Sequence, residues 1–288
     1  MAIVCTALMA ALLVFSDAAM AAARTALACF GSGVLPALLP MMVLGKMLPD
    51  AAGTRRRNAA GWLGTALFGF AAGSPASAQR LAPMRGGMSR RGWECLLCLT
   101  GVMSPMFFTG TLAGWLHSAR DGWVLLGVHW LGAAATAMLW ALTGAGRDER
   151  PSQRESTGAI ARPGLPEIIT QCAQSLLSVL GAMMIFSVAA SLLKSVCGAM
   201  FPAWTARHAD WMAVLWAVME IGGGSAAVIE QLKAPHAALG ALCGFGGLSI
   251  FLQNMLFLHA KIRPARLLAM RAVHGAVCYA IIRLLNPF

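Results

Sequence analysis

Residues 237–258 read AALGALCGFGGLSIFLQNMLFL, an uncharged apolar stretch that is interrupted near its middle by the glycines of 244–247. About 20 consecutive apolar residues are enough for a helix to cross the hydrocarbon core of a bilayer. A helix that breaks inside a membrane exposes backbone N–H and C=O groups, and these groups must find partners inside the protein or in a wet cavity. The stretch therefore predicts a discontinuous membrane helix whose break is covered by other parts of the chain.

The composition of the whole chain also indicates a membrane protein. Hydrophobic residues make up 58% of the 288 residues and charged residues only 11%, whereas a soluble domain has about 25% charged residues. So few polar residues could not cover a soluble fold, and the composition also excludes disorder, a coiled coil and a small disulfide scaffold. The CxxC pair of Cys95 and Cys98 has no second pair or histidine cluster in the sequence, so no metal site is expected. We therefore expect an all-α, polytopic membrane protein.

Apolar runs predict about seven crossings, at residues 3–22, 26–48, 93–117, 122–143, 168–197, 237–258 and 267–285. Two further apolar runs, 59–72 and 210–221, are too short to cross. They end at the small-residue segments 73–75 and 222–225, so we expect each to form a re-entrant hairpin. No positive charge precedes Arg24, which favours a retained first helix over a cleaved signal peptide.

The order of these segments predicts an inverted repeat. After an N-terminal membrane helix at 1–24, a first unit at 25–143 and a second at 167–288 are separated by a polar cytoplasmic linker at 144–166. Each unit contains a helix, a hairpin, a broken helix and a closing helix, and the breaks are expected at residues 101–105 and 244–247. Because each unit crosses three times, the two must have opposite orientations, with their hairpin tips close together near the midplane.

The charge distribution predicts the orientation. Lys and Arg number 22 against 11 Asp and Glu, for a net charge of +11, and the basic residues lie mainly between apolar runs. This pattern favours the positive-inside rule over nucleic-acid binding. If the Arg55–Arg57 loop is in the cytoplasm, 16 of the 22 basic residues lie on the cytoplasmic side. Arg271 is one of these 16, whereas Arg24 is assigned to the outer side. The prediction is a membrane protein with a cytoplasmic N-terminus and an outer C-terminus.

Several motifs resemble one protein family. Residues 244–253 (GFGGLSIFLQ) resemble the GFGGLSxxxQ signature of the YlbJ-like sporulation integral membrane proteins, part of the nucleoside-recognition (Gate) domain group. Residues 73–80, 104–110 and 219–223 resemble further family segments, although Ser74 replaces a usual Tyr. Ser77 replaces Gly, and residues 100–103 replace an Asn-rich stretch. The resemblance implies a membrane protein of spore-forming bacteria, located in the bacterial cell membrane or the forespore membrane. It also implies that the protein transports dipicolinate.

The hairpin tips and breaks supply the candidate substrate-binding residues, which offer backbone N–H groups, hydroxyls, amides and one guanidinium: Gly73, Ser74, Arg80, Ser104, Thr109, Gly223, Ser225, Gly246, Gly247, Ser249, Gln253 and Asn254. Glu220, a carboxylate on an apolar hairpin arm, is the candidate ion-coupling residue for H⁺ or Na⁺. The alternatives stay open. Each hydroxyl or amide can serve only to cap a broken helix, Arg80 can be an ordinary cytoplasmic arginine, and Glu220 an interfacial carboxylate.

These features together predict a transporter or permease for a small anionic or heterocyclic solute that works by alternating access. The alternative is a non-transporting assembly or structural protein of the spore envelope. An enzyme is not expected, because the sequence has no HExxH or GxSxG motif and no evident nucleophile–base pair. The expected partners are the solute, the lipid bilayer, and a second copy or other spore membrane proteins. No cofactor and no nucleic acid are expected.

Overall fold

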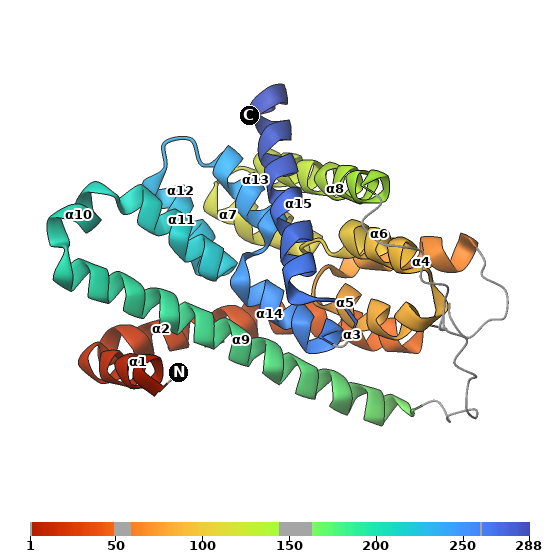
Figure 1. The fold of residues 1–288 in the computed structure, drawn as a ribbon, viewed down its shortest axis with the longest axis horizontal. Coiled ribbons are helices and arrows are strands. Elements are labelled where there is room, and N and C mark those ends of the chain that lie inside the picture. The colour runs from red at the N-terminus through yellow and green to blue at the C-terminus, as the bar shows by residue number, and fades with distance from the viewer. Residues whose placement is uncertain (1, 49–58, 144–162, 260) are drawn as a thin grey trace.

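The computed structural model describes residues 2–48, 59–143, 163–259 and 261–288, and in these ranges the regular structure is entirely helical (Figure 1). Five helical segments are long and apolar enough to cross a membrane: Ser16–Met47, Ala119–Leu142, Leu165–Met200, His236–Leu258 and Pro264–Leu285. The protein is therefore a multi-pass membrane protein by helix length and hydropathy. The predicted loop at Arg55–Arg57 and most of the predicted linker lie outside the described residues.

The N-terminal region differs from the prediction. The first helix, α1 (Ala2–Val14), ends where the chain turns at Phe15. Helix α2 (Ser16–Cys29), the π-helical segment η1 (Phe30–Val34) and α3 (Leu35–Met47) then follow one another without a loop.

The prediction of separate crossings at 3–22 and 26–48 is therefore wrong. The alanine-rich sequence around Arg24 favours helix and carries α2 through the predicted loop. The wide turn of η1 accommodates Gly31 and Gly33 without ending the helix. Arg24 consequently lies within a helix rather than in an outer loop.

The first unit continues with a helical hairpin and a broken helix. Its elements are α4 (Ala59–Ala72), α5 (Ala76–Leu81), η2 (Ala82–Gly87), α6 (Arg90–Thr100), η3 (Phe107–Leu112), α7 (Ala113–Trp115) and α8 (Ala119–Leu142). The turn at 73–75 joins α4 to α5, as predicted. The predicted crossing at 93–117 is interrupted at 101–104, also as predicted, where the backbone is not helical.

The second unit has the same order of elements. They are α9 (Leu165–Met200), α10 (Pro202–Arg207), α11 (Ala209–Met219), α12 (Ile221–Gln231), α13 (His236–Phe245), α14 (Gly247–Leu258) and α15 (Pro264–Leu285). Helices α11 and α12 form a hairpin, and α13 and α14 are separated at Gly246, within the predicted break. At 36 residues, α9 is about 54 Å long, which exceeds a hydrocarbon core of about 30 Å.

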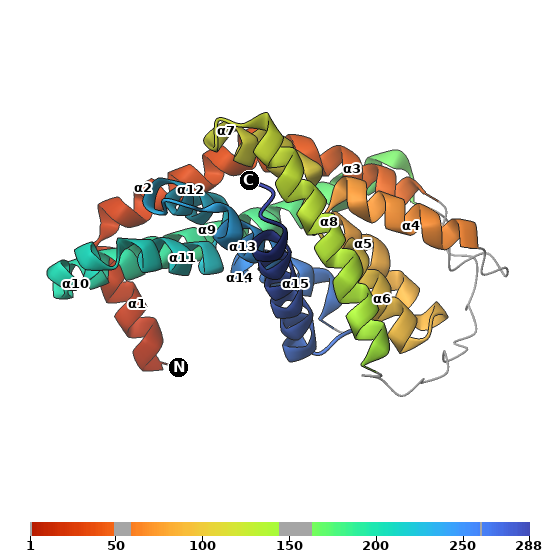
Figure 2. The same cartoon turned by 90° about the horizontal axis from the view of Figure 1, so that it is seen from above.

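The two units pack against each other through their closing helices. Helix α15 packs against α8 and α13, and α8 also packs against α6; Figure 2 shows α15, α8 and α6 lying in succession. One apolar core joins η3, α8, α11, α12, α13, α14 and α15, while two others lie around α5 and along α9. Large apolar side chains on the outside, such as Leu13, Leu142 and Leu284, are at least 74% exposed, as expected for a surface that faces lipid.

Candidate functional site at two broken helices

The tip of the first hairpin lies directly against the first helix break. Gly73 has a φ of +70°, and a Cβ there would lie 2.4 Å from the backbone nitrogen of Ser104. The next residue, Ser74, donates its backbone N–H to the carbonyl of Val102 at 2.7 Å. Only glycine fits at position 73, because any side chain would separate the tip from the break.

The backbone groups freed at this break find partners on three different elements. The Val102 carbonyl accepts from the hairpin tip, and the backbone N–H of Met103 donates to Nε2 of His129 on α8 at 2.9 Å. The Gly101 carbonyl accepts from Nη1 of Arg271 on α15. The break is thus stabilised from outside its own helix, as non-helical backbone in a membrane requires.

Arg271 connects this break to the second one. Its side chain is buried, at 5% exposure, and its Nη2 donates to the hydroxyl of Ser74 at 2.9 Å. A Cβ on Gly246, at the second break, would lie 3.7 Å from Nη1. Among the described residues no carboxylate forms an ion pair with this guanidinium. A buried cation at the junction of two broken helices is the principal electrostatic feature of the site.

The sequence-based prediction missed Arg271, because the charge count assigned it to the inner basic segment. A signal was present, since the residue falls inside the apolar run 267–285, where a charge is a functional indicator. A cavity of about 10 Å³ lies beside the guanidinium, with Thr136 and His274 among its lining residues. This volume is close to that of one water molecule.

Glu220 forms the tip of the second hairpin, whereas the segment 222–225, the predicted tip, lies in the first turn and a half of α12. The carboxylate is 5% exposed, and its two oxygens accept from the backbone N–H groups of Gly222 at 2.9 Å and Gly223 at 2.7 Å. Glu220 is therefore the N-cap of α12, where a negative charge also interacts favourably with the helix dipole. This contact gives the carboxylate a structural role that the sequence did not indicate.

The second hairpin tip lies against the second break, as the first tip does against the first. Gly246 and Gly247 have φ values of +83° and +72°. A Cβ on Gly247 would lie 3.2 Å from the carbonyl oxygen of Ala217 and 3.4 Å from the backbone nitrogen of Ile221. The two units thus share one arrangement, in which a hairpin tip touches a helix break of the same unit.

The remaining polar candidates divide into two groups. Thr109 donates to the carbonyl of Pro105 at 3.0 Å, and Gln253 donates to the Ser249 hydroxyl at 3.1 Å, so these groups are satisfied within their own segments. The Ser225 hydroxyl and both polar atoms of the Asn254 amide are buried without a hydrogen-bond partner among the described residues. Buried groups of this kind are commonly completed by water or a ligand.

Arg80 lies apart from the two breaks. Its Nη1 donates to the carbonyls of Gly45 at 2.9 Å and Leu48 at 3.1 Å, where α3 ends. The residue lines a cavity of about 430 Å³ between α3, α5 and the beginning of α9. A second cavity, of about 130 Å³, lies between the other end of α9, α11 and α12. Figure 1 shows the beginning of α9 and the α10 region at opposite ends of the molecule.

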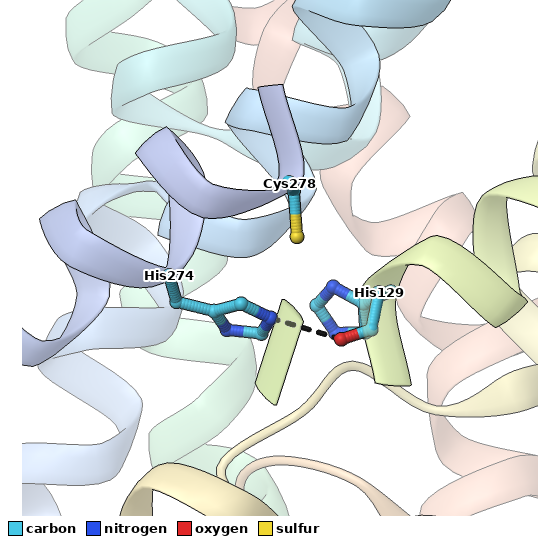
Figure 3. Close-up of side chains that lie close together, drawn as sticks. All are labelled: His129, His274 and Cys278. Atoms are coloured by element: carbon cyan, nitrogen blue, oxygen red, sulfur yellow. Dashed lines mark hydrogen bonds between the residues drawn. The ribbon is translucent and has the colours of Figure 1, made fainter. Parts of the chain in front are cut away.

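Two of the six histidines meet in the core, beside a cysteine. The rings of His129 and His274 stack at 4.6 Å, and ligand atoms of these residues and Cys278 lie within 4.8 Å of one another (Figure 3). The hydrogen bonds do not suit a metal ion. Nε2 of His129 accepts from Met103, which leaves the ring proton on Nδ1, and Nε2 of His274 faces the His129 carbonyl at 3.0 Å. Of the three residues, His129 contacts the first break, through the backbone N–H of Met103.

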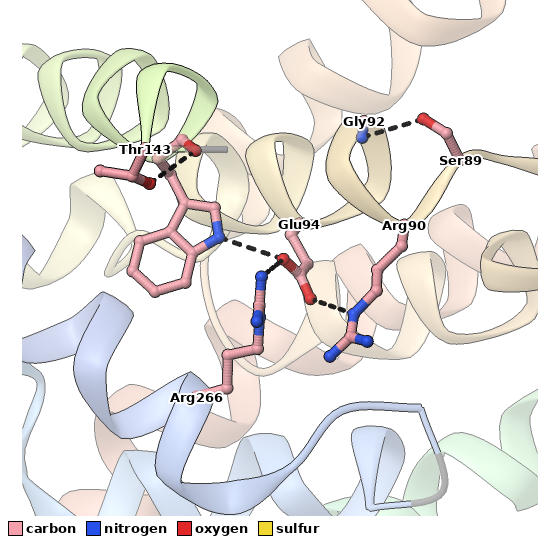
Figure 4. A network of polar contacts seen from close by, with 7 residues as sticks. Ser89, Arg90, Gly92, Glu94, Thr143 and Arg266 are labelled. Carbon is pink, nitrogen blue, oxygen red and sulfur yellow. Dashed lines mark hydrogen bonds and ion pairs between the residues drawn. The ribbon is translucent and has the colours of Figure 1, made fainter. Parts of the chain in front are cut away.

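A network around Glu94 joins the ends of α6, α8 and α15. The Glu94 carboxylate, on α6, accepts from Arg90 at 3.0 Å, from Arg266 on α15 at 2.7 Å, and from the Trp140 indole on α8 at 3.1 Å (Figure 4). Glu94 is 2% exposed, so the network replaces the water that its charge would otherwise require. No local pattern in the sequence distinguishes Glu94 as part of such a network.

Comparison with known proteins identifies no relative: no family model, curated protein or solved structure matches the chain. The resemblance of residues 244–253 to the YlbJ-like family stays a prediction.

Proposed function

We propose that this protein is a membrane transporter or permease for a small anionic or heterocyclic solute. The observation that carries the proposal is the pair of hairpin tips, each seated against a broken helix, with Arg271 between the two breaks. Paired discontinuous helices at corresponding places in two halves are typical of transporter binding sites. The buried guanidinium favours an anion, because its charge has no acidic partner among the described residues.

In this proposal the two units form an inverted repeat, and both hairpins are re-entrant. The broken helix of the first unit crosses as α6 to α7, and the other crossings are the five long spans. The 430 Å³ cavity then faces the cytoplasm and the 130 Å³ cavity the outside, about 39 Å apart along α9 between Ile168 and Lys194. Rocking of the units would open the central site to each cavity in turn.

The N-terminal orientation is revised in this arrangement. Helix α1 has 13 residues and is about 20 Å long, which is too short for a crossing. The Ser16–Met47 helix is followed by the basic loop, whose positive charge places it in the cytoplasm. Helix α1 then lies on the outer side, whereas the charge pattern alone predicted a cytoplasmic N-terminus.

Glu220 is the proposed coupling residue, for H⁺ or Na⁺. Protonation would remove the negative charge from the N-terminus of α12 and free one of the two carboxylate oxygens from its N–H partner. The hairpin tip at the second break would loosen in consequence. Coupling thus acts through the hairpin rather than through direct contact with the solute.

The resemblance to the sporulation family suggests dipicolinate as the solute, and uptake of labelled dipicolinate into proteoliposomes tests the proposal. We expect saturable uptake by the wild type, driven by an imposed proton or Na⁺ gradient, and uptake lowered by at least about tenfold in Glu220→Gln. The matched control is Asp210→Asn, which neutralises an exposed carboxylate on the same hairpin and should leave uptake unchanged. Equal uptake by Glu220→Gln and the wild type would rule out the coupling role.

One observation favours a non-transporting role in assembly of the spore envelope. The backbone of the first break is closed by partners from the protein itself, and the cavity beside Arg271 holds only about one water. A purely structural protein would need no larger space. Absence of uptake for dipicolinate and for a panel of other small anions, under either gradient, would favour this second role.

A further inference from the structure

We propose that the 130 Å³ cavity beside α9 binds the headgroup of an aminophospholipid, a membrane lipid that carries a phosphate and a primary ammonium. The cavity is lined by α9, by α10 and by α11 and α12, the two arms of the second hairpin. Figure 1 shows α11 running back from α10 alongside α9. Small-molecule pockets begin at about 300 Å³, so this smaller cavity suits one headgroup rather than a whole solute.

Two opposite charges line this cavity from different elements. Lys194 lies on α9 and Glu230 lies near the end of α12, and both residues are exposed. They form no ion pair with each other or with any other charged group in the part of the chain that the structure describes. A ligand with one negative and one positive group can therefore pair with both, with its phosphate at Lys194 and its ammonium at Glu230.

An aromatic ring of the hairpin positions the lysine. The Nζ of Lys194 lies 5.4 Å from the ring centroid of Trp216 on α11, which also lines the cavity. This cation–π contact holds the ammonium without using a carboxylate. It also occupies the ring face that a quaternary choline group would otherwise contact. A primary ammonium, which can donate hydrogen bonds to Glu230, is therefore the better fit.

The apolar part of the lining suits the acyl chains of a lipid. Leu193 and Leu215 line the cavity and are 37% and 42% exposed on the outside of the protein. Helix α9 is about 54 Å long and extends beyond a hydrocarbon core of about 30 Å, and Lys194 lies about 9 Å before its end. The charged groups can thus reach the headgroup layer while the leucines contact acyl chains.

A lipid bound here would join the second hairpin to α9. Both hairpin arms line the cavity, and the backbone N–H of Glu220, at the hairpin tip, donates to the carbonyl of Trp216 at 2.8 Å. In the proposed transport cycle this cavity faces the outside, so a bound headgroup would hold the hairpin in place and keep this route closed. That consequence rests on the proposed function, but lipid binding is measured without transport, so the two proposals can fail separately.

The test places the full-length protein in nanodiscs with equal parts of phosphatidylethanolamine, phosphatidylcholine and phosphatidylglycerol, and native mass spectrometry measures the retained lipid. We expect the wild type to retain phosphatidylethanolamine at least about fivefold over either other lipid. Phosphatidylcholine cannot donate a hydrogen bond from its ammonium, and phosphatidylglycerol has no cation for Glu230. The preference should disappear in Lys194→Gln and in Glu230→Gln.

Matched controls separate the cavity from general surface charge. Lys233→Gln and Asp210→Asn remove exposed charges of the same two signs that do not line the cavity, and both should keep the lipid preference of the wild type. Lys194→Arg keeps the positive charge and should also keep it, which guards against misfolding as the cause of a loss.

A second arm distinguishes a membrane lipid from a free zwitterion. Soluble glycerophosphoethanolamine has the same headgroup without acyl chains, and it should displace phosphatidylethanolamine only at a concentration at least about tenfold above that of a short-chain phosphatidylethanolamine. Equal potency of the two competitors would overturn the assignment to a lipid. Equal retention of the three lipids by the wild type, or an unchanged preference in the Lys194→Gln or Glu230→Gln variant, would overturn the site itself.

Discussion

Arg271 shows how one side chain joins the two halves of this protein. Burying a guanidinium costs several kcal/mol unless hydrogen bonds replace its water. Here it donates to Gly101 and Ser74 in the first unit and lies beside Gly246 in the second. The charge itself has no acidic partner among the described residues, so the hydrogen bonds explain its position but not the need for a cation.

The variants Arg271→Gln and Arg271→Lys separate the contribution of the hydrogen bonds from the contribution of the charge. Glutamine keeps one donor group but no charge, and the loss of one charge-assisted hydrogen bond should cost about 1.5–3 kcal/mol of stability. We expect uptake to fall at least about tenfold in Arg271→Gln, and Arg271→Lys to retain part of it because the charge remains. Uptake and the Tm of the purified protein are measured for each.

Thr136→Val is the matched control for this experiment. Thr136 lines the same small cavity, and its hydroxyl donates only to the Gly132 carbonyl within α8. Its replacement should leave uptake and Tm nearly unchanged. If the Arg271→Gln variant took up the solute as fast as the wild type, Arg271 would have only a structural role.

At the scale of the elements, short and broken helices depend on contacts from their neighbours. Helix α6 has 11 residues, too few for stability in isolation, and it ends where the first break begins. The Glu94 network ties this helix to α8 and α15 at one end, while His129 and Arg271 hold its break at the other. Both ends of α6 are therefore fixed to the same two closing helices.

The Glu94 network predicts a large loss of stability when its carboxylate is removed. Glu94→Ala leaves Arg266 and the Trp140 indole without their acceptor and should lower the free energy of unfolding by roughly 3 kcal/mol. Thermal unfolding of the purified protein measures the effect. A double-mutant cycle with Arg266→Ala should show a coupling of about 1 kcal/mol or more between the two residues, whereas additive effects would contradict the network.

For the whole molecule, the proposed orientation in the membrane depends on the charge pattern along the chain. Segments assigned to the cytoplasm include the loop before α15, and those assigned outside include α10 and the loop after α12. The assignment depends on both hairpins being re-entrant, since a full crossing by either one would reverse every later segment.

Cysteine labelling tests this orientation directly. In a cysteine-free background, Arg207→Cys and Lys233→Cys should react with an impermeant reagent added outside the cell, and Arg263→Cys only after the membrane is opened. All three positions are exposed in the structure, so failure to react cannot arise from burial in the protein. Reaction of 207 and 263 from the same side would disprove the inverted arrangement.

The sequence by itself determined that the chain is a helical membrane protein, because hydropathy depends on composition along the chain. It also located the long spans after residue 119, the two short hairpins and both breaks, since runs of apolar residues and clusters of glycine and proline are local signals. The error at the N-terminus arose where Arg24 suggested a loop and the surrounding alanines continued the helix.

Only the tertiary structure decided which side chains complete the breaks. His129 and Arg271 are 26 and 170 residues away from the backbone atoms they bind, and no local pattern pairs such distant positions. The same holds for Lys46, which donates to Gln171 across the two units. Hydropathy shows that a polar residue lies within or beside an apolar helix. Which partner it faces depends on how the helices pack, because a buried polar group is stable only where the folded chain brings a donor or acceptor to it.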